Sequence, residues 1–172
     1  MSFVKLTNKV VLEHYKIGDY LVSYADRIFY RKTSETLSLL DILPTRFRND
    51  FTVVSMDILY NIPPHTDSGI KCTINFYVKP GNYKTIFYDI KDENIINTFQ
   101  VKNQTNGKVY DRDNLLETNS FCAKKDEIYL LDTTKIHSVI SKTPSHRFAL
   151  CVQTNKFCYE DVKKMLSEMG NI

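Results

Sequence analysis

The chain of 172 residues has the length of one globular domain, with 42% hydrophobic and 25% charged residues. Its formal charge of +3 is too small to indicate nucleic-acid binding by itself, and the sequence contains no apolar run of membrane-spanning length. The four cysteines form no CxxC pair and follow no leader-like N-terminus, so we expect reduced, buried thiols in a cytoplasmic protein. Eleven Tyr and ten Phe favour β-sheet.

The N-terminal third of the chain predicts two short strands followed by a helix. Apolar runs at residues 10–12 and 20–24 favour strands, with a turn at 17–19 between them. Leucines recur at spacings of three between residues 34 and 43, which indicates a helix that Pro44 ends.

From residue 51 onward the sequence predicts one strand after another, separated by turn residues. Within residues 71–78 alternate side chains would share a face, with Cys72, Ile74, Phe76 and Val78 on one side and Thr73, Asn75 and Tyr77 on the other. Further strands are expected at 51–60, 84–90, 127–131, 138–140 and 148–154, with a hairpin turn at 80–82 and a second hairpin across 99–110.

The C-terminus predicts a helix whose apolar stripe serves packing, because Val162, Met165, Leu166 and Met169 lie at i, i+3, i+4 and i+7. Many short strands with few helices indicate a mainly β protein, most economically a double-sheet jelly roll with flanking helices. We expect one domain over residues 1–172. Its parts would be N-terminal strands and a helix at 1–50, a jelly-roll core at 51–155 and a C-terminal helix at 158–170.

His65 and Asp67 form the first candidate for metal coordination. In an extended segment, residues i and i+2 project from the same face, so an imidazole and a carboxylate would point at one spot. His-x-Asp is a short motif, and the pair alone is equally consistent with a polar loop at a strand edge. His14 and His146 have no carboxylate at a useful spacing, and we expect both to be surface or packing residues.

The second half of the chain offers a third ligand and a cation. Residues 126–132 indicate a turn into a strand, and a short connection leads from there to His137. Two His and one carboxylate from separate strands form a facial triad, which leaves half of an octahedral coordination sphere open, as non-haem Fe(II) oxygenases require. A structural zinc site would close all four positions, usually with Cys, and the cysteines here lack a suitable spacing. Arg147 lies ten residues beyond His137. Its guanidinium either binds a carboxylate through two parallel hydrogen bonds or belongs to an ordinary surface residue of a strand.

In order and spacing, these residues resemble the 2-oxoglutarate/Fe(II)-dependent oxygenase superfamily. Residues 63–67 (Pro-Pro-His-Thr-Asp) are similar to its metal-binding strand, 71–78 to the apolar strand that follows, 126–137 to the strand with the distal histidine, and Arg147 to its co-substrate arginine. The likeness covers about residues 51–153. It implies a double-stranded β-helix in which Fe(II) is held by His65, Asp67 and His137, 2-oxoglutarate is bound by Arg147, and O2 is the oxidant.

The sequence departs from the usual family pattern in two places. The distance from Asp67 to His137 is long for a compact member and suggests an insertion around residues 91–120. Ala149 stands where some subfamilies carry a serine that touches the co-substrate. Candidates for the remaining co-substrate contacts are Asn75, Tyr77 and Tyr60; alternatively, the face with Asn75 and Tyr77 points outward.

The resemblance implies a dioxygenase that hydroxylates an unactivated C–H bond, with release of succinate and CO2, and no catalytic residue beyond the metal ligands. Asp67 as a ligand implies hydroxylation, since halogenating relatives lack that carboxylate. A small-molecule or peptide substrate, such as an amino acid or a protein side chain, is favoured over nucleic acid, because the expected insertion carries acidic and basic residues in balance. A cupin-like metal protein with other chemistry and a non-catalytic jelly-roll binding module stay open as alternatives. The sequence leaves the oligomeric state open.

Overall fold

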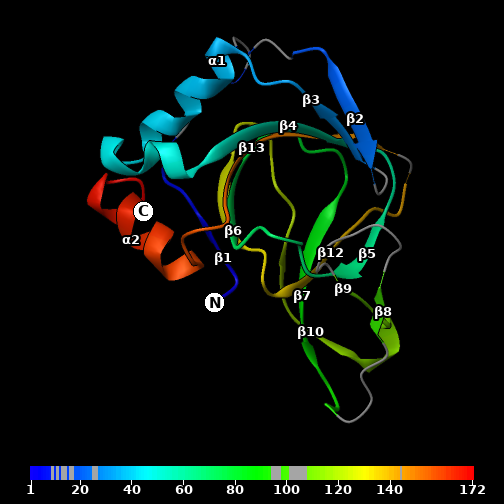
Figure 1. The fold of residues 1–172 in the computed structure, drawn as a ribbon. Coiled ribbons are helices and arrows are strands. Elements are labelled where there is room, and N and C mark those ends of the chain that lie inside the picture. The colour runs from blue at the N-terminus through cyan, green and yellow to red at the C-terminus, as the bar shows by residue number, and fades with distance from the viewer. Residues whose placement is uncertain are drawn as a thin grey trace.

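Two antiparallel β-sheets face one another in the computed structural model (Figure 1). The model describes residues 1–8, 10, 12, 15, 18–24, 27–93, 98–100, 108–143 and 145–172, with the side chains of 22–24 and 98–100 left aside. The first sheet has the strand order β1-β11-β6-β13-β4-β3-β2 and the second β10-β7-β12-β5-β9-β8. The strands are β1 (Phe3–Lys5), β2 (Tyr20–Tyr24), β3 (Arg27–Tyr30), β4 (Thr52–Ile58), β5 (Ile62–His65), β6 (Cys72–Lys79), β7 (Lys84–Ile90), β8 (Thr98–Gln100), β9 (Lys108–Tyr110), β10 (Leu115–Phe121), β11 (Ile128–Asp132), β12 (Ile136–Ile140) and β13 (Arg147–Thr154).

Eight of these strands form the jelly roll that the sequence predicts. Strands β4, β6, β11 and β13 lie next to one another in the first sheet, and β5, β7, β10 and β12 do so in the second. From β4 to β7 and from β10 to β13 the chain changes sheet at each step, and only the connection from β7 to β10 stays within one sheet. This strand order is that of a double-sheet jelly roll, also called a double-stranded β-helix.

The alternation predicted for residues 71–78 separates two interiors. Cys72, Ile74 and Phe76 of β6 belong to the main hydrophobic core, which lies between the outer face of the first sheet and the helices. The intervening side chains Thr73, Asn75 and Tyr77 line a cavity between the sheets instead. The face that carries Asn75 and Tyr77 therefore points into the jelly roll, because side chains alternate along a strand.

Helical segments cover the first sheet on the side away from the cavity (Figure 1). The helix predicted at 34–43 forms as one α-helical turn, α1 (Ser34–Leu37), which continues into the 3-10 helix η2 (Ser38–Ile42). A second 3-10 helix, η3 (Thr45–Asp50), follows Pro44. Thr33 and Thr36 make a capping box at the start of α1.

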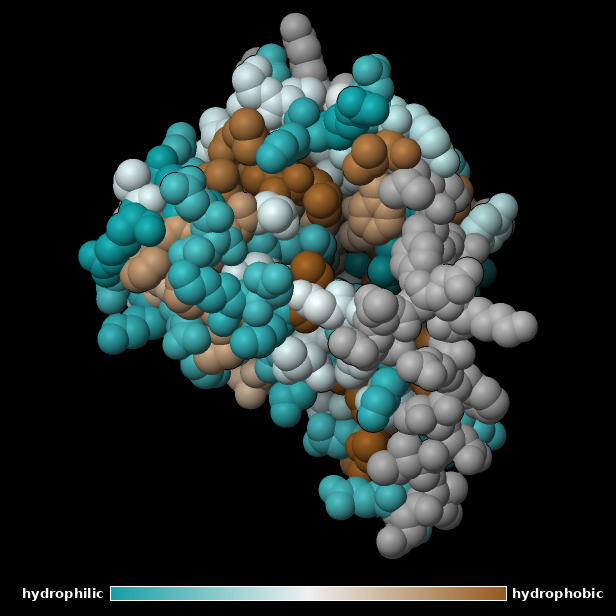
Figure 2. All heavy atoms as spheres, viewed as in Figure 1, coloured by the Kyte–Doolittle hydropathy of each residue, from teal (hydrophilic) through white to brown (hydrophobic). Residues whose placement is uncertain are grey.

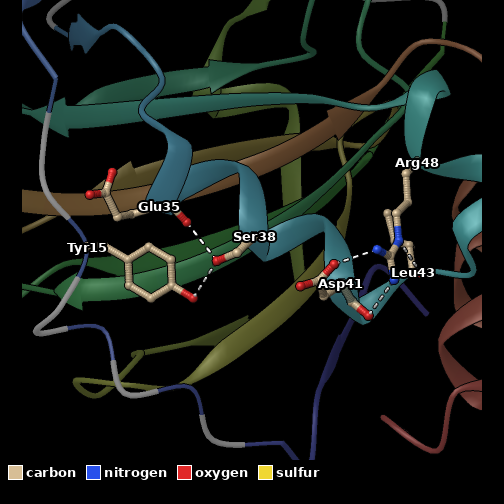
Figure 3. A network of polar contacts seen from close by, with 6 residues as sticks. All are labelled: Tyr15, Glu35, Ser38, Asp41, Leu43 and Arg48. Atoms are coloured by element: carbon tan, nitrogen blue, oxygen red, sulfur yellow. Dashed lines mark hydrogen bonds and ion pairs between the residues drawn. The ribbon is translucent and has the colours of Figure 1, made fainter.

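Polar contacts hold this helical segment together (Figure 3). The Ser38 hydroxyl donates to the Glu35 carbonyl at 2.7 Å and lies 3.4 Å from the Tyr15 hydroxyl. Arg48 forms an ion pair with Asp41 and donates from Nε to the Leu43 carbonyl at 3.0 Å. The Arg48 bond gives the carbonyl of Leu43, the C-terminal cap of η2, a hydrogen-bond donor.

The C-terminal helix α2 (Tyr159–Glu168) packs on the same core with most of its predicted stripe. Val162, Met165 and Leu166 are buried, as expected. Met169 is not: it follows the helix as its C-terminal cap and is 43% exposed. Tyr159, one turn before Val162, completes the buried stripe at the other end.

The prediction of a first strand at residues 10–12 is wrong. The chain instead begins with β1, which pairs with β11, and Leu12 lies in a 3-10 turn, 1% exposed in the main core. Val10 is outside any strand, and Val11 lies outside the described residues. A short apolar run signals burial, and burial of Leu12 here comes from packing without strand pairing. Of the cysteines, Cys72 and Cys151 are buried as expected, but Cys122 and Cys158 are exposed; all four are free.

The insertion expected at 91–120 is shorter than predicted. Strands β8 and β9 form the predicted hairpin, with Phe99 opposite Val109, while its turn at 101–107 lies outside the described residues. After a 3-10 turn, η4 (Arg112–Asn114), the chain enters β10, which is one of the eight core strands. β10 is an edge strand with a largely exposed, polar middle, so it lacks the apolar pattern of a buried strand.

Among the described residues, no helix combines the length and the apolar character that crossing a bilayer requires.

Candidate metal centre and its cavity

The two strands β5 and β12 lie side by side in the second sheet and bring His65 and His137 together (Figure 1). The two residues are direct cross-strand partners, and their ring centroids are 4.4 Å apart. Asp67 follows the end of β5, where its backbone N–H donates to the Thr133 carbonyl at 3.1 Å. One ligand atom from each of the three residues lies within 4.8 Å of the other two. The structure thus brings together the three residues that the sequence predicts as metal ligands.

Both imidazole rings are held by their own backbone. His65 Nδ1 lies 2.8 Å from the Pro63 carbonyl, and His137 Nδ1 lies 2.9 Å from the Lys135 carbonyl. A carbonyl oxygen can only accept, so in both rings the proton is on Nδ1 and Nε2 carries the lone pair through which the ring can bind a cation. Fixing the ring and its tautomer through the second nitrogen is what metal-binding histidines require.

The ionisation of the site suits a divalent metal. Burial alone would raise the pKa of the Asp67 carboxyl, but the neighbouring ionisable groups, among them the Arg27 guanidinium, hold it well below its usual range. Burial first and the neighbouring His65 ring second lower the pKa of His137 to about 4, against the Asp67 carboxylate, which raises it. At neutral pH the site therefore presents a carboxylate and a neutral His137, the protonation states in which these groups coordinate metals.

The donor set also limits which site this can be. Two imidazoles and one carboxylate form the one group of three or more potential ligands in the described part of the chain. Three ligands on one side leave the other positions open, which excludes a closed structural zinc site and fits a catalytic metal. The residues present therefore fit Fe(II), and the same donor types also bind Mn(II) and Zn(II).

A cavity of about 410 Å³ lies between the two sheets and contains all three residues. Figure 2 shows a hollow near the middle of the face seen in Figure 1, beside apolar side chains drawn in brown. The cavity lies within the range of small-molecule sites, which measure roughly 300–1,000 Å³. Apolar side chains form much of its wall: Phe29, Met56, Ile58, Ile62, Ile70, Val109, Leu131, Val139 and Ala149.

Arg147 extends into this cavity from the start of β13, and the surface reading of this residue is wrong. It is 2% exposed, and its Nη1 donates to the Thr85 hydroxyl at 2.7 Å. Nη2 donates to the Tyr83 carbonyl at 2.6 Å, and Nε to the Pro80 carbonyl at 3.3 Å. None of the carboxylates described lies within ion-pair distance of this guanidinium. A buried cation without a counter-ion is costly, so a cavity built around one favours an anionic ligand.

The weaker candidates divide into two groups. Asn75 and Tyr77 line the cavity, and the Asn75 amide lies 3.5 Å from the Tyr77 hydroxyl. The ring of Tyr77 also lies under the Arg147 guanidinium, 5.2 Å from ring centroid to Cζ. Tyr60 is 65% exposed and lies outside the set of residues that line the cavity. The structure thus places Asn75 and Tyr77 in the same cavity as Arg147, with Tyr77 next to the guanidinium, but it does not place Tyr60 there.

His146 stays apart from this centre, and the sequence reasoning missed one arginine of the cavity. The imidazole of His146 is exposed at the surface, 3.6 Å from Asp57, as expected for a surface histidine. His14 lies outside the described residues. Arg27 of β3 lines the cavity, with Nη2 2.8 Å from His65 Nε2. A single arginine between Asp26 and Ile28 belongs to no recognisable motif, and only the pairing of β3 with β4 reveals its position.

Comparison with known proteins finds similarity to solved structures alone. No protein-family model matches the chain, and no curated protein does so by sequence. Similar solved structures include a cupin-like protein from Thermotoga maritima, with 7% identity, a TM-score of 0.41 and coverage of 84% of this chain and 82% of that one. The vicilin from Corylus avellana has 14% identity, a TM-score of 0.41 and coverage of 85% and 33%, respectively. The vicilin from Solanum melongena has 11% identity, a TM-score of 0.41 and coverage of 78% and 30%.

Proposed function

We propose that this chain is an Fe(II)- and 2-oxoglutarate-dependent dioxygenase that hydroxylates an unactivated C–H bond of a small molecule or peptide. One observation carries the proposal: a cavity of about 410 Å³ holds both an open His-Asp-His triad and a buried arginine without a counter-ion. A metal protein with other chemistry would use the triad, but it would need the arginine only if its own ligand were an anion. A module that binds an anion would need the arginine but not the triad.

The three ligands and Arg147 would have separate tasks. His65, Asp67 and His137 would hold the metal. The orientation of each imidazole ring is fixed by the backbone carbonyl that accepts a hydrogen bond from its Nδ1. Iron with 2-oxoglutarate and O2 supplies the oxidising chemistry, with succinate and CO2 as products. Arg147 would bind the far carboxylate of 2-oxoglutarate, and its charge cannot be lost by deprotonation at neutral pH.

The donors left on Arg147 match a carboxylate. A guanidinium has five N–H groups, and three described acceptors take one each from Nε, Nη1 and Nη2. One N–H on each terminal nitrogen is therefore left, and two such donors side by side bind a carboxylate through two parallel hydrogen bonds. Tyr77 and Thr85 would complete the polar end of the cavity, while the apolar wall would exclude water from the reacting C–H bond.

The proposal is tested by titrating the purified protein with Fe(II) and 2-oxoglutarate without oxygen. We expect the weak visible absorption of an iron–2-oxoglutarate chelate in wild type and its loss in Asp67→Ala, because that variant lacks the one anionic ligand. Asp41→Ala is the matched control, since Asp41 is exposed and pairs with Arg48 away from the cavity. A wild-type protein that binds Fe(II) but shows no such absorption with 2-oxoglutarate would contradict the proposal.

A further inference from the structure

A second arginine reaches the metal site from outside the eight-strand core. Arg27 of β3 pairs with Ile58 of β4, and Ile58 in turn pairs with Arg147 of β13. The three residues therefore form one row across neighbouring strands, with both arginines in the wall of the same cavity. Cross-strand neighbours lie about 5 Å apart, so the two guanidinium groups enter the cavity at separate points.

The hydrogen bond of Arg27 cannot coexist with a bound metal. Its Nη2 donates to His65 Nε2 at 2.8 Å. Because His65 Nδ1 donates to the Pro63 carbonyl, Nε2 carries the single lone pair of the ring. That lone pair serves either Arg27 or a metal ion. Metal binding therefore releases the Arg27 guanidinium inside the cavity.

The released guanidinium would lack a partner of its own. Its Nε is already buried without a hydrogen-bond acceptor among the described residues. The described lining of the cavity contains one carboxylate, Asp67, which the metal would use. Arg27 is partly buried, and a partly buried cation left in this way favours an anion from outside the chain.

The charges of the filled site give the same answer. A divalent ion, the Asp67 carboxylate and the two guanidinium groups together carry three net positive charges. A dianionic 2-oxoglutarate would leave one, and a single further negative charge would bring the cavity to neutrality. Neutrality matters here because charges interact strongly in an enclosed site of low dielectric. A phosphate dianion would overshoot, whereas a carboxylate matches both the charge and the planar fork of the guanidinium.

The surroundings of Arg27 describe the rest of the ligand. Phe29 follows two residues later on the same face of β3, and its cross-strand partner Met56 also lines the cavity with Ile58 and Ile62. This wall suits an aliphatic or aromatic body. With Asp67 committed to the metal, the described lining offers no carboxylate for an ammonium group, which disfavours a free α-amino acid.

We propose that Arg27 binds the carboxylate of the substrate, and that the substrate is a small carboxylic acid with an apolar body and no cationic group. This inference rests on the proposed function, because it treats the site as one that holds 2-oxoglutarate at Arg147. It narrows the proposed substrate class from amino acids and peptides in general to carboxylic acids whose remaining part is apolar and uncharged.

The test uses Zn(II)-loaded protein with saturating 2-oxoglutarate, which binds ligands without turnover, and measures affinity by calorimetry. The probes are hexanoate and 3-phenylpropanoate, each compared with its amide and with 6-aminohexanoate. We expect wild type to bind an acid at least about tenfold more tightly than its amide, the usual effect of one charge-assisted contact. 6-Aminohexanoate should bind as weakly as the amides.

Three variants locate the effect. Arg27→Gln should abolish the difference between acid and amide, Arg27→Lys should keep part of it, and Arg46→Gln, which removes an exposed arginine of η3, should keep all of it. Arg27→Gln should also bind Zn(II) more tightly than wild type, because nothing then competes for His65 Nε2. That gain shows that the variant is folded.

Several results would overturn the inference. One is that wild type binds acids and amides equally tightly, or binds no acid at all. Another is that Arg27→Gln keeps the wild-type preference for the acid over its amide. A further one is a loss of 2-oxoglutarate affinity in Arg27→Gln as large as in Arg147→Gln, since Arg27 would then hold the co-substrate. If the Zn(II) protein binds no 2-oxoglutarate at all, the proposed function fails, and the same acid–amide comparison without 2-oxoglutarate still decides the role of Arg27.

Discussion

Replacing Arg147 with Gln should remove most of the 2-oxoglutarate affinity of the metal-loaded protein. The two N–H groups left over after the bonds to Pro80, Tyr83 and Thr85 would make two charge-assisted bonds to one carboxylate. Losing that contact should cost about 2–3 kcal/mol, or roughly 30- to 150-fold in affinity. Arg147→Lys should recover little of it, because an ammonium keeps the charge without the planar fork.

Thermal unfolding with and without 2-oxoglutarate measures this loss within each variant. Arg147 also bonds to the β6–β7 turn, so the variant itself should be less stable, and the ligand-induced shift cancels that effect. At a 2-oxoglutarate concentration about 100 times the wild-type Kd, binding should stabilise wild type by about 2.7 kcal/mol, which shifts Tm by roughly 5–11 °C for a chain of this size. A variant that binds about 100-fold more weakly should gain only about 0.4 kcal/mol, a shift of roughly 1–2 °C.

The control and the contradicting result are both clear. Arg46→Gln removes an exposed arginine and should show the full wild-type shift. An Arg147→Gln variant with the same 2-oxoglutarate-induced shift as wild type would show that Arg147 only supports the β6–β7 turn. The assignment of the co-substrate to this arginine would then be wrong.

Two further predictions concern stability away from the metal. Burial would raise the pKa of Glu127, but hydrogen bonds from Lys5, the Lys124 N–H and Tyr129 lower it overall. A carboxyl group with a lowered pKa stabilises the fold at pH values above its unfolded pKa of 4.5. In chemical denaturation, Glu127→Gln should therefore have a lower free energy of unfolding than wild type at pH 7, and this difference should disappear as the pH falls through the folded pKa. An equal deficit at pH 3 would contradict this sign. Gly81→Ala should lower the free energy of unfolding by more than the roughly 1–2 kcal/mol of a left-handed alanine, because its Cβ would lie 2.3 Å from the Ser145 hydroxyl. Gly170→Ala, with a similar φ of 73° and open space around its Cβ, should cost only that amount. Equal costs for the two variants in urea unfolding would refute the role of the clash.

Local sequence patterns were sufficient for the parts of the fold that depend on one segment at a time. The two-residue period of 71–78 predicted which side chains share a face, and the structure confirms that division. It left open whether the face with Asn75 and Tyr77 points inward or outward. The helical period of the C-terminus predicted the buried face of α2 correctly except at Met169. The helix ends before that residue, so helical periodicity no longer determines which way its side chain points. The patterns failed where a residue is buried without belonging to a strand, or where a strand pairs without being buried. Leu12 is buried outside any strand, and β10 is one of the eight core strands although it has no apolar run.

The residue types and chain order of His65, Asp67, His137 and Arg147 determined the chemistry that the sequence could suggest. Only the tertiary structure decided that these side chains share one cavity, because the register of β5 against β12 and of β4 against β13 depends on pairing between distant segments. For the same reason the sequence could not find Arg27. Its strand lies outside the eight-strand core, and its place beside His65 follows from the pairing of Arg27 with Ile58.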